Sequence, residues 1–169
     1  GDDTVYELAL TTAFDVSTAS SVRELDVSDE ETSSSGLAFN LDGTKMFVTG
    51  NSGDDVNEYA LSTGFNLSTA VYAGDDEKFS VRDQETYPID LDFNSDGTRM
   101  FVMGWNGNDI NEYTLSTGFD VSTASFVDSF SVSSQETGPA ALAFSSDGSK
   151  MFVVGDIGKD VNEYSLVSP

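Results

Sequence analysis

The stretch VNEYAL at residues 56–61 decides the fold, because copies of it recur along the chain. INEYTL stands at 110–115, VNEYSL at 161–166 and the more distant VYELAL at 5–10. Successive copies start 51, 54 and 51 residues apart. Self-similarity at this period indicates a repeat architecture in which neighbouring units pack together. We therefore predict that residues 1–169 form a single repeat domain. Its units are 5–55, 56–109, 110–160 and a partial fourth at 161–169.

Three further blocks lie between these copies. A Ser/Thr-rich turn reads STGFNLSTA at 62–70 and STGFDVSTA at 116–124. A run ending in Glu-Thr reads LDVSDEET at 25–32, FSVRDQET at 79–86 and FSVSSQET at 130–137. An apolar hairpin reads GLAFNLDGTKMFVTG at 36–50, DLDFNSDGTRMFVMG at 90–104 and ALAFSSDGSKMFVVG at 141–155. No window shows the helical period, and the Asp-Gly pairs favour tight turns, so each unit is predicted to hold four short β-strands.

A unit of about 50 residues with four antiparallel strands fits the blade of a β-propeller. The hairpin blocks, such as NLDGTKMFV at 40–48, resemble the repeats of bacterial YVTN and WD40-like propellers over nearly the whole chain. The resemblance implies an all-β fold of four-stranded antiparallel blades, about three to a chain, and it identifies no activity. A β-solenoid is the alternative, although solenoid coils are usually shorter and lack Asp-Gly hairpins.

Three blades are too few for a ring, since propellers close with roughly 4–8. An open array would also leave an apolar blade face uncovered at each end. We therefore expect the chain to assemble with itself. A homodimer would give six blades, and a homotrimer with nine is the alternative. One copy of the recurring strand, 5–10 or 161–166, should then be displaced or pair elsewhere. The ending SLVSP at 165–169 is expected to be a natural terminus.

The composition excludes several kinds of function. Asp and Glu number 30 against 7 Lys and Arg, with no His, for a net charge of -23. This charge disfavours nucleic acids and anionic membrane surfaces as partners. Because Cys and His are both absent, disulfides, thiolate or imidazole metal sites and His-based triads are excluded. We interpret the acidic surface as salt-adapted and expect an extracellular or cell-surface protein.

Carboxylates gather on one rim of the predicted propeller. Strand order places three glutamates directly before the innermost strands, namely Glu31, Glu85 and Glu136. Loops rich in Asp, Asn and Gly share that rim, and calcium favours such clustered oxygen ligands. The candidate metal ligands in these loops are Asp54, Asp55, Asp109 and Asp160. Alternatively, these side chains only hydrogen-bond to nearby backbone, and no spacing here matches a known calcium loop.

Trp105 is the only tryptophan and lies beside Asn106 and Asn108 in a rim loop of the middle unit. An exposed indole flanked by amides can stack on a sugar ring, although it can equally fill a gap between blades. Together with the three rim glutamates, these residues form the predicted binding surface for a cation, a glycan or a protein.

Most carboxylates recur in register, whereas chemistry on one substrate needs an asymmetric site. We therefore expect a non-catalytic binding or structural module, not an enzyme, without catalytic residues. The alternative is a carboxylate-dependent glycan hydrolase, which needs two carboxylates in unlike environments. Asp90 and Asp92 occur only in the middle unit and are the candidates for that role.

Overall fold

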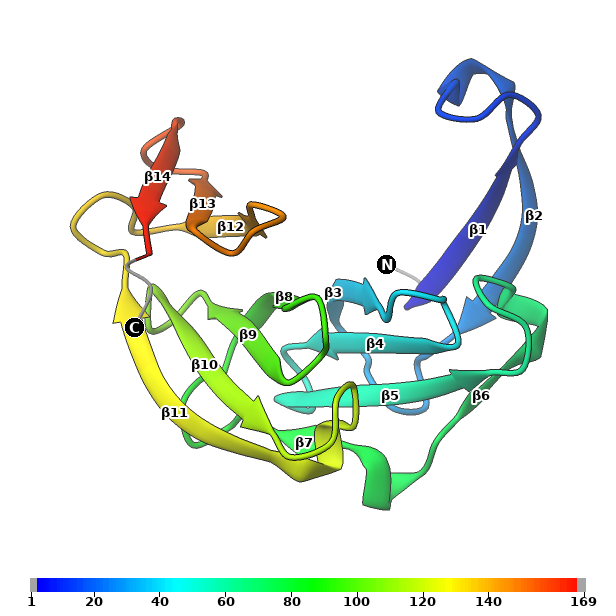
Figure 1. Ribbon diagram of the computed structural model, residues 1–169, viewed down its shortest axis with the longest axis horizontal. Coiled ribbons are helices and arrows are strands. Elements are labelled where there is room, and N and C mark those ends of the chain that lie inside the picture. The colour runs from blue at the N-terminus through cyan, green and yellow to red at the C-terminus, as the bar shows by residue number, and fades with distance from the viewer. Residues whose placement is uncertain (1–2, 167–169) are drawn as a thin grey trace.

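The computed structural model describes residues 3–166, and in this part of the chain the strands form four antiparallel sheets. The sheets follow one another along an open arc (Figure 1). Sheet 1 contains β1 (Thr4–Leu10) and β2 (Ala19–Asp26). Sheet 2 contains β3 (Ser34–Phe39), β4 (Lys45–Gly50), β5 (Asp55–Leu61), β6 (Ala70–Tyr72) and β7 (Phe79–Ser80). Sheet 3 contains β8 (Pro88–Phe93), β9 (Arg99–Gly104), β10 (Asp109–Leu115) and β11 (Ala124–Ser131). Sheet 4 contains β12 (Pro139–Phe144), β13 (Lys150–Gly155) and β14 (Val161–Ser165).

The predicted all-β fold of antiparallel blades is confirmed in its coarse form. Sheet 3 has the complete order β8-β9-β10-β11, and each predicted hairpin block forms two paired antiparallel strands. Each repeat unit gives its first two strands to one sheet and its last two to the next. In sheet 2 the outer strand is split into β6 and β7, because the three extra residues of this repeat form the short helix η3 (Asp75–Glu77).

Turn chemistry explains the short connections. Each Asp-Gly turn uses glycine at a left-handed φ, between 68° and 71°, while the preceding aspartate accepts a backbone N–H two residues on. The loops between the third and fourth strands end in short 3-10 helices: η1 (Val16–Thr18), η2 (Leu67–Thr69) and η4 (Val121–Thr123). In each of these loops one phenylalanine holds a left-handed φ: Phe14, Phe65 and Phe119.

The hydrophobic core lies between adjacent sheets. Between sheets 2 and 3, Phe47 is fully buried and its ring centroid lies 4.6 Å from that of Phe93. Met100, Tyr113 and Val121 belong to the same cluster, each at 0% exposure. The repeat-equivalent rings between sheets 3 and 4, Phe101 and Phe144, lie 4.4 Å apart. Alternating apolar residues therefore fasten each sheet to the next.

The first and last sheets are incomplete and stand at opposite ends of the arc (Figure 1). Both copies of the recurring strand pair locally, β1 with β2 and β14 with β13. The expected displacement of one copy is therefore not seen within a single chain. Residues 167–169 of the partial fourth repeat, which carry most of the SLVSP ending, lie outside the described residues. Among the helices described, none has the length and apolar character needed to cross a membrane.

Candidate functional site

The three rim glutamates are buried, with exposures of 1–2%, and they bind backbone. Glu85 accepts the N–H groups of Tyr87 at 2.6 Å and Gly107 at 2.9 Å. Glu136 accepts those of Gly138 and Gly158 in the same pattern, and Glu31 those of Ser33, Ser52 and Gly53. Each carboxylate thus links two segments of the same sheet. One segment leads into the innermost strand, and the other is the loop that follows the second strand. Hydrogen bonding to nearby backbone was the alternative to ligand binding in the sequence analysis.

A glycine supports each of these contacts. A side chain at Gly104 would collide with the carboxylate of Glu85, and Gly155 stands in the same relation to Glu136. Although burial acts in the opposite direction, the backbone N–H donors lower the pKa of Glu136 below its ordinary value. Glu136 therefore binds its donors as a carboxylate, and this stabilisation is lost as the pH falls through its folded-state pKa.

The predicted metal ligands occupy separate loops, and each has a local contact. Asp54 is buried with Arg82 at 3.8 Å, and Asp55 lies 3.3 Å from the Lys78 ammonium. Asp109 and Asp160 each accept a hydrogen bond at 3.0 Å from the asparagine two residues on. Asp55 is the first residue of β5 in sheet 2, and Asp54 directly precedes it. Asp109 lies at the start of β10 in sheet 3, and Asp160 directly before β14 in sheet 4.

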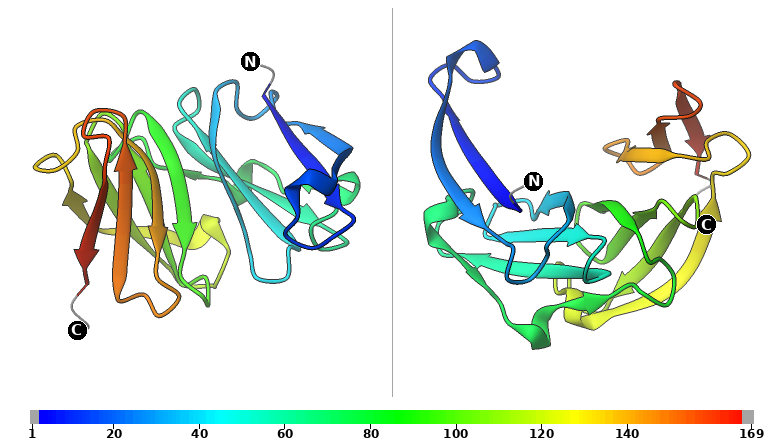
Figure 2. Two further views of the ribbon diagram at one scale, coloured as in Figure 1. Left: turned by 90° about the horizontal axis from the view of Figure 1, so that it is seen from above. Right: turned by 180° about the vertical axis from the view of Figure 1, so that it is seen from behind.

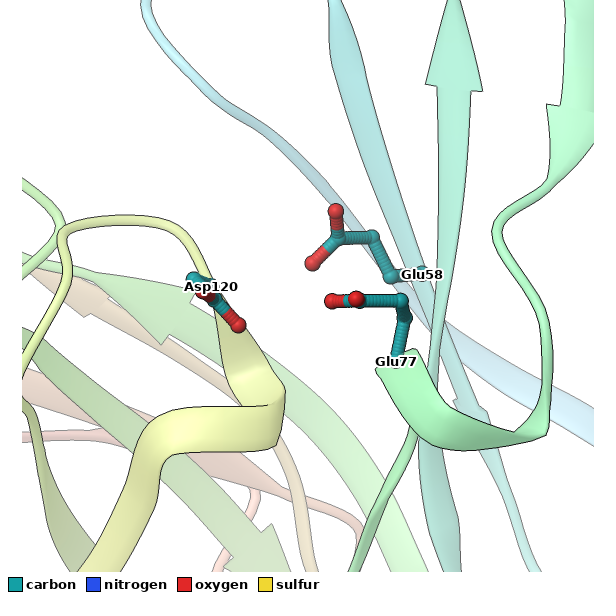
Figure 3. A group of neighbouring side chains, drawn as sticks. All are labelled: Glu58, Glu77 and Asp120. Atoms are coloured by element: carbon teal, nitrogen blue, oxygen red, sulfur yellow. The ribbon is translucent and has the colours of Figure 1, made fainter.

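A different group of carboxylates meets between sheets 2 and 3. Glu58 of β5, Glu77 of η3 and Asp120 before η4 point toward one another (Figure 3). One carboxylate oxygen of each lies within 4.8 Å of the other two, and among the residues that the structure describes no other three acidic groups come together in this way. The Lys45 ammonium lies 2.6 Å from Glu58 and supplies one positive charge. Burial nevertheless raises the pKa of Glu58, against the opposing effect of Lys45. The sequence spacing did not reveal this group, because its members come from three elements.

Calcium binding, one of the ligand types that the sequence suggests, can be tested directly at this group as well as at the rim loops. If the carboxylates bind calcium, a hundredfold excess over Kd should add about 2.7 kcal/mol and raise the melting temperature by roughly 5–10 °C. Differential scanning fluorimetry in calcium and in EDTA measures this shift. Replacing Glu77 by glutamine should remove the response. A shift below about 1 °C would contradict calcium binding.

A shallow pocket of about 430 Å³ lies on the rim where the innermost strands of three sheets begin. Trp105 and Tyr87 form its aromatic side, with ring centroids 6.4 Å apart and exposures of 36% and 41%. The remaining lining residues are Ser33, Ser34, Ser35, Asn51, Ile89, Pro139 and Ala140. An aromatic side faced by hydroxyl and amide groups suits a sugar-like ring. Tyr87 was missed in the sequence, because only the fold brings it beside Trp105.

The two predicted amides do not line this pocket. Asn106 donates a hydrogen bond at 3.0 Å to the Thr86 hydroxyl. Asn108 adopts a left-handed φ of 48°, and its side-chain oxygen is buried without a hydrogen-bond partner. Both residues therefore shape the loop that carries Trp105. The indole also reaches the start of sheet 4, because a Cβ on Gly138 would lie 3.3 Å from it.

Asp90 and Asp92 lie on β8, the innermost strand of sheet 3. Asp90 follows Ile89 of the pocket, and its two carboxylate oxygens accept the N–H groups of Leu91 at 3.0 Å and Leu142 at 2.9 Å. Burial raises its pKa, and the charge of Asp92 adds to that rise while the N–H donors oppose it. Asp92 accepts one N–H, from Phe93 at 2.8 Å, and burial raises its pKa too. The two carboxylates thus differ in surroundings.

No protein-family model matches the sequence, and no curated protein matches it by sequence. The resemblance to YVTN and WD40-like repeats therefore rests on the sequence motifs. Several solved structures share the fold. A protein of Bacteroides uniformis assigned as a 6-phosphogluconolactonase aligns with a TM-score of 0.65 and 12% identity, over 98% of this chain and 48% of its own. A Bacteroides fragilis protein with the same assignment gives a TM-score of 0.63, 15% identity and coverages of 96% and 47%. The periplasmic gluconolactonase of Pseudomonas aeruginosa aligns with a TM-score of 0.59 and 18% identity, over 96% of this chain and 44% of its own.

These neighbours place the chain among β-propeller folds, and the chain spans about half their length. They also correct one expectation. We expected a non-catalytic module and not an enzyme, because the near-equal blades looked too symmetric for chemistry. The three neighbours named above carry the names of lactone-hydrolysing enzymes. Repetition of the scaffold is therefore no argument against catalysis, because a single unlike residue, such as Asp90 among small counterparts, makes a site asymmetric.

Proposed function

We propose that the chain forms part of a hydrolase that opens a neutral sugar-derived lactone. In this proposal Asp90 is the acid–base group and the Trp105–Tyr87 pocket holds the sugar ring. One observation carries the proposal. Asp90 stands one residue beyond the pocket, at a position where the other two hairpin repeats have Gly36 and Ala141. A half-buried carboxylate therefore replaces small residues in one blade, the blade whose rim loop carries the only Trp of the chain.

The surroundings of Asp90 suit proton transfer. A general base works best when its pKa is not far below the working pH, and burial moves the pKa of Asp90 upward in that direction. The neighbouring charge of Asp92 supports the same shift. Each oxygen of Asp90 receives one backbone N–H, which orients the carboxylate and leaves a second lone pair free on each oxygen.

The reaction follows from these groups. As a carboxylate, Asp90 takes a proton from water while the water oxygen bonds to the lactone carbonyl carbon. The bond between that carbon and the ring oxygen then breaks, and Asp90 returns the proton to the departing alkoxide. Water is thereby added across the ester bond, giving a hydroxy acid.

The charge of the protein narrows the substrate class. None of the pocket-lining residues is Lys or Arg, and the chain carries a net charge of -23. A phosphorylated lactone would be repelled and would lack a cationic partner. We therefore propose a neutral lactone, although two of the structural neighbours are named for a phosphorylated one. An extracellular location also remains part of the proposal. The acidic surface supports it, and one neighbour is named as periplasmic.

Lactone hydrolysis tests the proposal. The 169-residue chain should hydrolyse a neutral aldonolactone faster than buffer does, as measured with a pH indicator. Asp90→Asn keeps one hydrogen-bond acceptor but cannot exchange protons, and kcat should fall roughly 10²–10⁴-fold. Asp76→Asn is the control, since Asp76 is an exposed carboxylate of η3. Trp105→Ala should mainly raise KM.

Three outcomes would count against it. A wild-type rate equal to that of buffer would overturn lactone hydrolysis. Full activity in Asp90→Asn would show that Asp90 only joins β8 to β12. Faster cleavage of an aryl glycoside than of the lactone would favour the glycan hydrolase that the sequence suggested as the alternative.

A further inference from the structure

Phe119 shows how the loop between the third and fourth strands secures a blade. Its N–H donates to Gly97 at 3.0 Å, and its carbonyl accepts the Lys45 ammonium at 2.7 Å. Its ring packs against Phe47 and Phe93, with centroids 6.4 and 5.4 Å away. The loop therefore covers the turn of its own sheet and fills the groove toward the preceding sheet.

The same loop in sheet 1 has nothing to cover. Phe14 matches Phe119 in sequence and in φ, 61° against 56°, but it is 99% exposed. Val16 is 80% exposed, whereas its counterparts Leu67 and Val121 are 5% and 0% exposed. The loop projects away from the rest of the chain (Figure 2). The β1–β2 hairpin thus holds the backbone shape of an inserted loop without its partner.

The matching groove is open at the other end of the chain. Between sheets 3 and 4 lies a hollow of about 880 Å³. Its lining includes the repeat counterparts of the residues around Phe119, namely Arg99, Phe101, Glu112, Phe144, Gly148 and Met151. A Cβ on Gly97 would meet the Phe119 ring, and one on Gly43 would meet the Phe65 ring. A Cβ on Gly148 would meet nothing within 4 Å.

We propose that the β1–β2 hairpin of a second copy of this chain inserts Phe14 and Val16 into this groove. The Phe14 N–H would then donate to Gly148, as Phe119 does to Gly97. The Arg99 guanidinium, which pairs with Glu112 as Lys45 pairs with Glu58, would donate to the Phe14 carbonyl. The occupant is identified by equivalence, because the same sequence element fills the same groove one blade earlier. This inference does not depend on the proposed lactonase activity.

Insertion of the partner's hairpin also requires that one copy of the recurring strand be displaced. β1 and β14 are two copies of the third strand, so only one can pair with β13 in the completed sheet. Glu7 of β1 accepts the Leu67 N–H at 2.9 Å, which holds β1 against sheet 2 of its own chain. β14 has an exposed outer edge, with Val161 at 66%. We therefore assign β14 as the strand displaced by the partner's β1.

Two copies suit the arc. The chain covers 48% of the Bacteroides uniformis propeller, so two copies approximate the length of one such chain. Exchange of hairpins at both junctions would close a ring of six blades from two chains. Asp92 would become enclosed, since its counterpart Ala38 packs against the cluster beneath Phe119. Asp90 would remain beside the rim pocket.

One residue of the hairpin, Ala13, allows a substitution that should strengthen association. Ala13 stands where the other two loops have Gly64 and Gly118. A Cβ at either glycine would collide with the carbonyl oxygen of Asp42 or Asp96. The Ala13 methyl should therefore press on the Asp147 carbonyl of the second copy. Ala13→Gly should tighten association about tenfold or more, a change worth about 1.4 kcal/mol.

Light scattering after size-exclusion chromatography, over a range of concentrations in high salt, tests the proposal. The wild-type chain should approach 36.0 kDa, twice its 18.0 kDa, as concentration rises. Phe14→Ser with Val16→Ser should stay at 18.0 kDa with an unchanged circular dichroism spectrum. Val71→Ser is the control, since Val71 is 67% exposed on β6 but lies outside the hairpin.

Mixing provides a second measurement. Arg99→Glu damages the groove and leaves the hairpin intact, so its mixture with the Phe14 variant should restore one of the two junctions and form a heterodimer. A wild-type chain that stays monomeric at 100 µM, about a hundredfold above a micromolar Kd, would overturn the proposal. A dimer unaffected by the Phe14 and Val16 changes would overturn the hairpin assignment. A mass of three chains would overturn the two-copy ring.

Discussion

Replacing Glu85 by alanine is expected to lower the free energy of unfolding by about 3–5 kcal/mol, because two partly buried N–H groups lose their acceptor at about 1–3 kcal/mol each and a buried cavity remains. Glu85 is 2% exposed and binds the Tyr87 and Gly107 N–H groups. Urea unfolding followed by tryptophan fluorescence measures the loss. Since Trp105 lies in the loop that Glu85 holds, local loosening would also change its emission in the absence of urea.

Two further variants separate hydrogen bonding from packing. Glu85→Gln retains one acceptor oxygen and should lose less than Glu85→Ala. Gly104→Ala should be destabilising as well, because its Cβ would occupy the position of the Glu85 carboxylate. Glu24→Ala is the control, an exposed glutamate on β2 for which a change within about 0.5 kcal/mol is expected. A loss below about 1 kcal/mol in Glu85→Ala would contradict the backbone role of the rim glutamates.

Replacing Phe47 by alanine should cost about 3–5 kcal/mol, the range for a large apolar side chain removed from a closed core. Phe47 is fully buried between sheets 2 and 3, beneath Phe93 and Phe119. The repeat-equivalent change Phe101→Ala should cost less in the isolated chain, because Phe101 lines the open groove between sheets 3 and 4. Urea unfolding at low protein concentration compares the two variants.

The difference in destabilisation between the two variants should also depend on association of the chain. If a second copy fills the groove, the cost of Phe101→Ala should rise toward that of Phe47→Ala as the protein concentration increases. Equal costs at low concentration would contradict the open groove. A cost for Phe47→Ala below about 2 kcal/mol would contradict a tightly packed core between sheets 2 and 3.

Local chemistry made much of the fold predictable. The strands within 36–50, 90–104 and 141–155 and their Asp-Gly turns follow from patterns a few residues long. The outer strand of sheet 2 was less predictable, because the extra residues near Ala73–Glu77 split it into β6 and β7 around η3. Placing Glu31, Glu85 and Glu136 before the innermost strands was also correct. The sequence could not show whether these glutamates bind backbone or a ligand, since both roles use the same carboxylate.

The sequence by itself determined the period, the strands, the turns and the exclusion of Cys and His chemistry, because each depends on residue identity and short-range geometry. Tertiary structure alone decided which side chains meet across sheets. Tyr87 joins Trp105, Glu58 joins Glu77 and Asp120, and Phe119 is covered while Phe14 is exposed. Phe14 and Phe119 have similar sequence contexts and similar left-handed φ angles. Their difference arises because burial depends on the neighbouring sheet, a long-range contact that repeat-equivalent residues need not share.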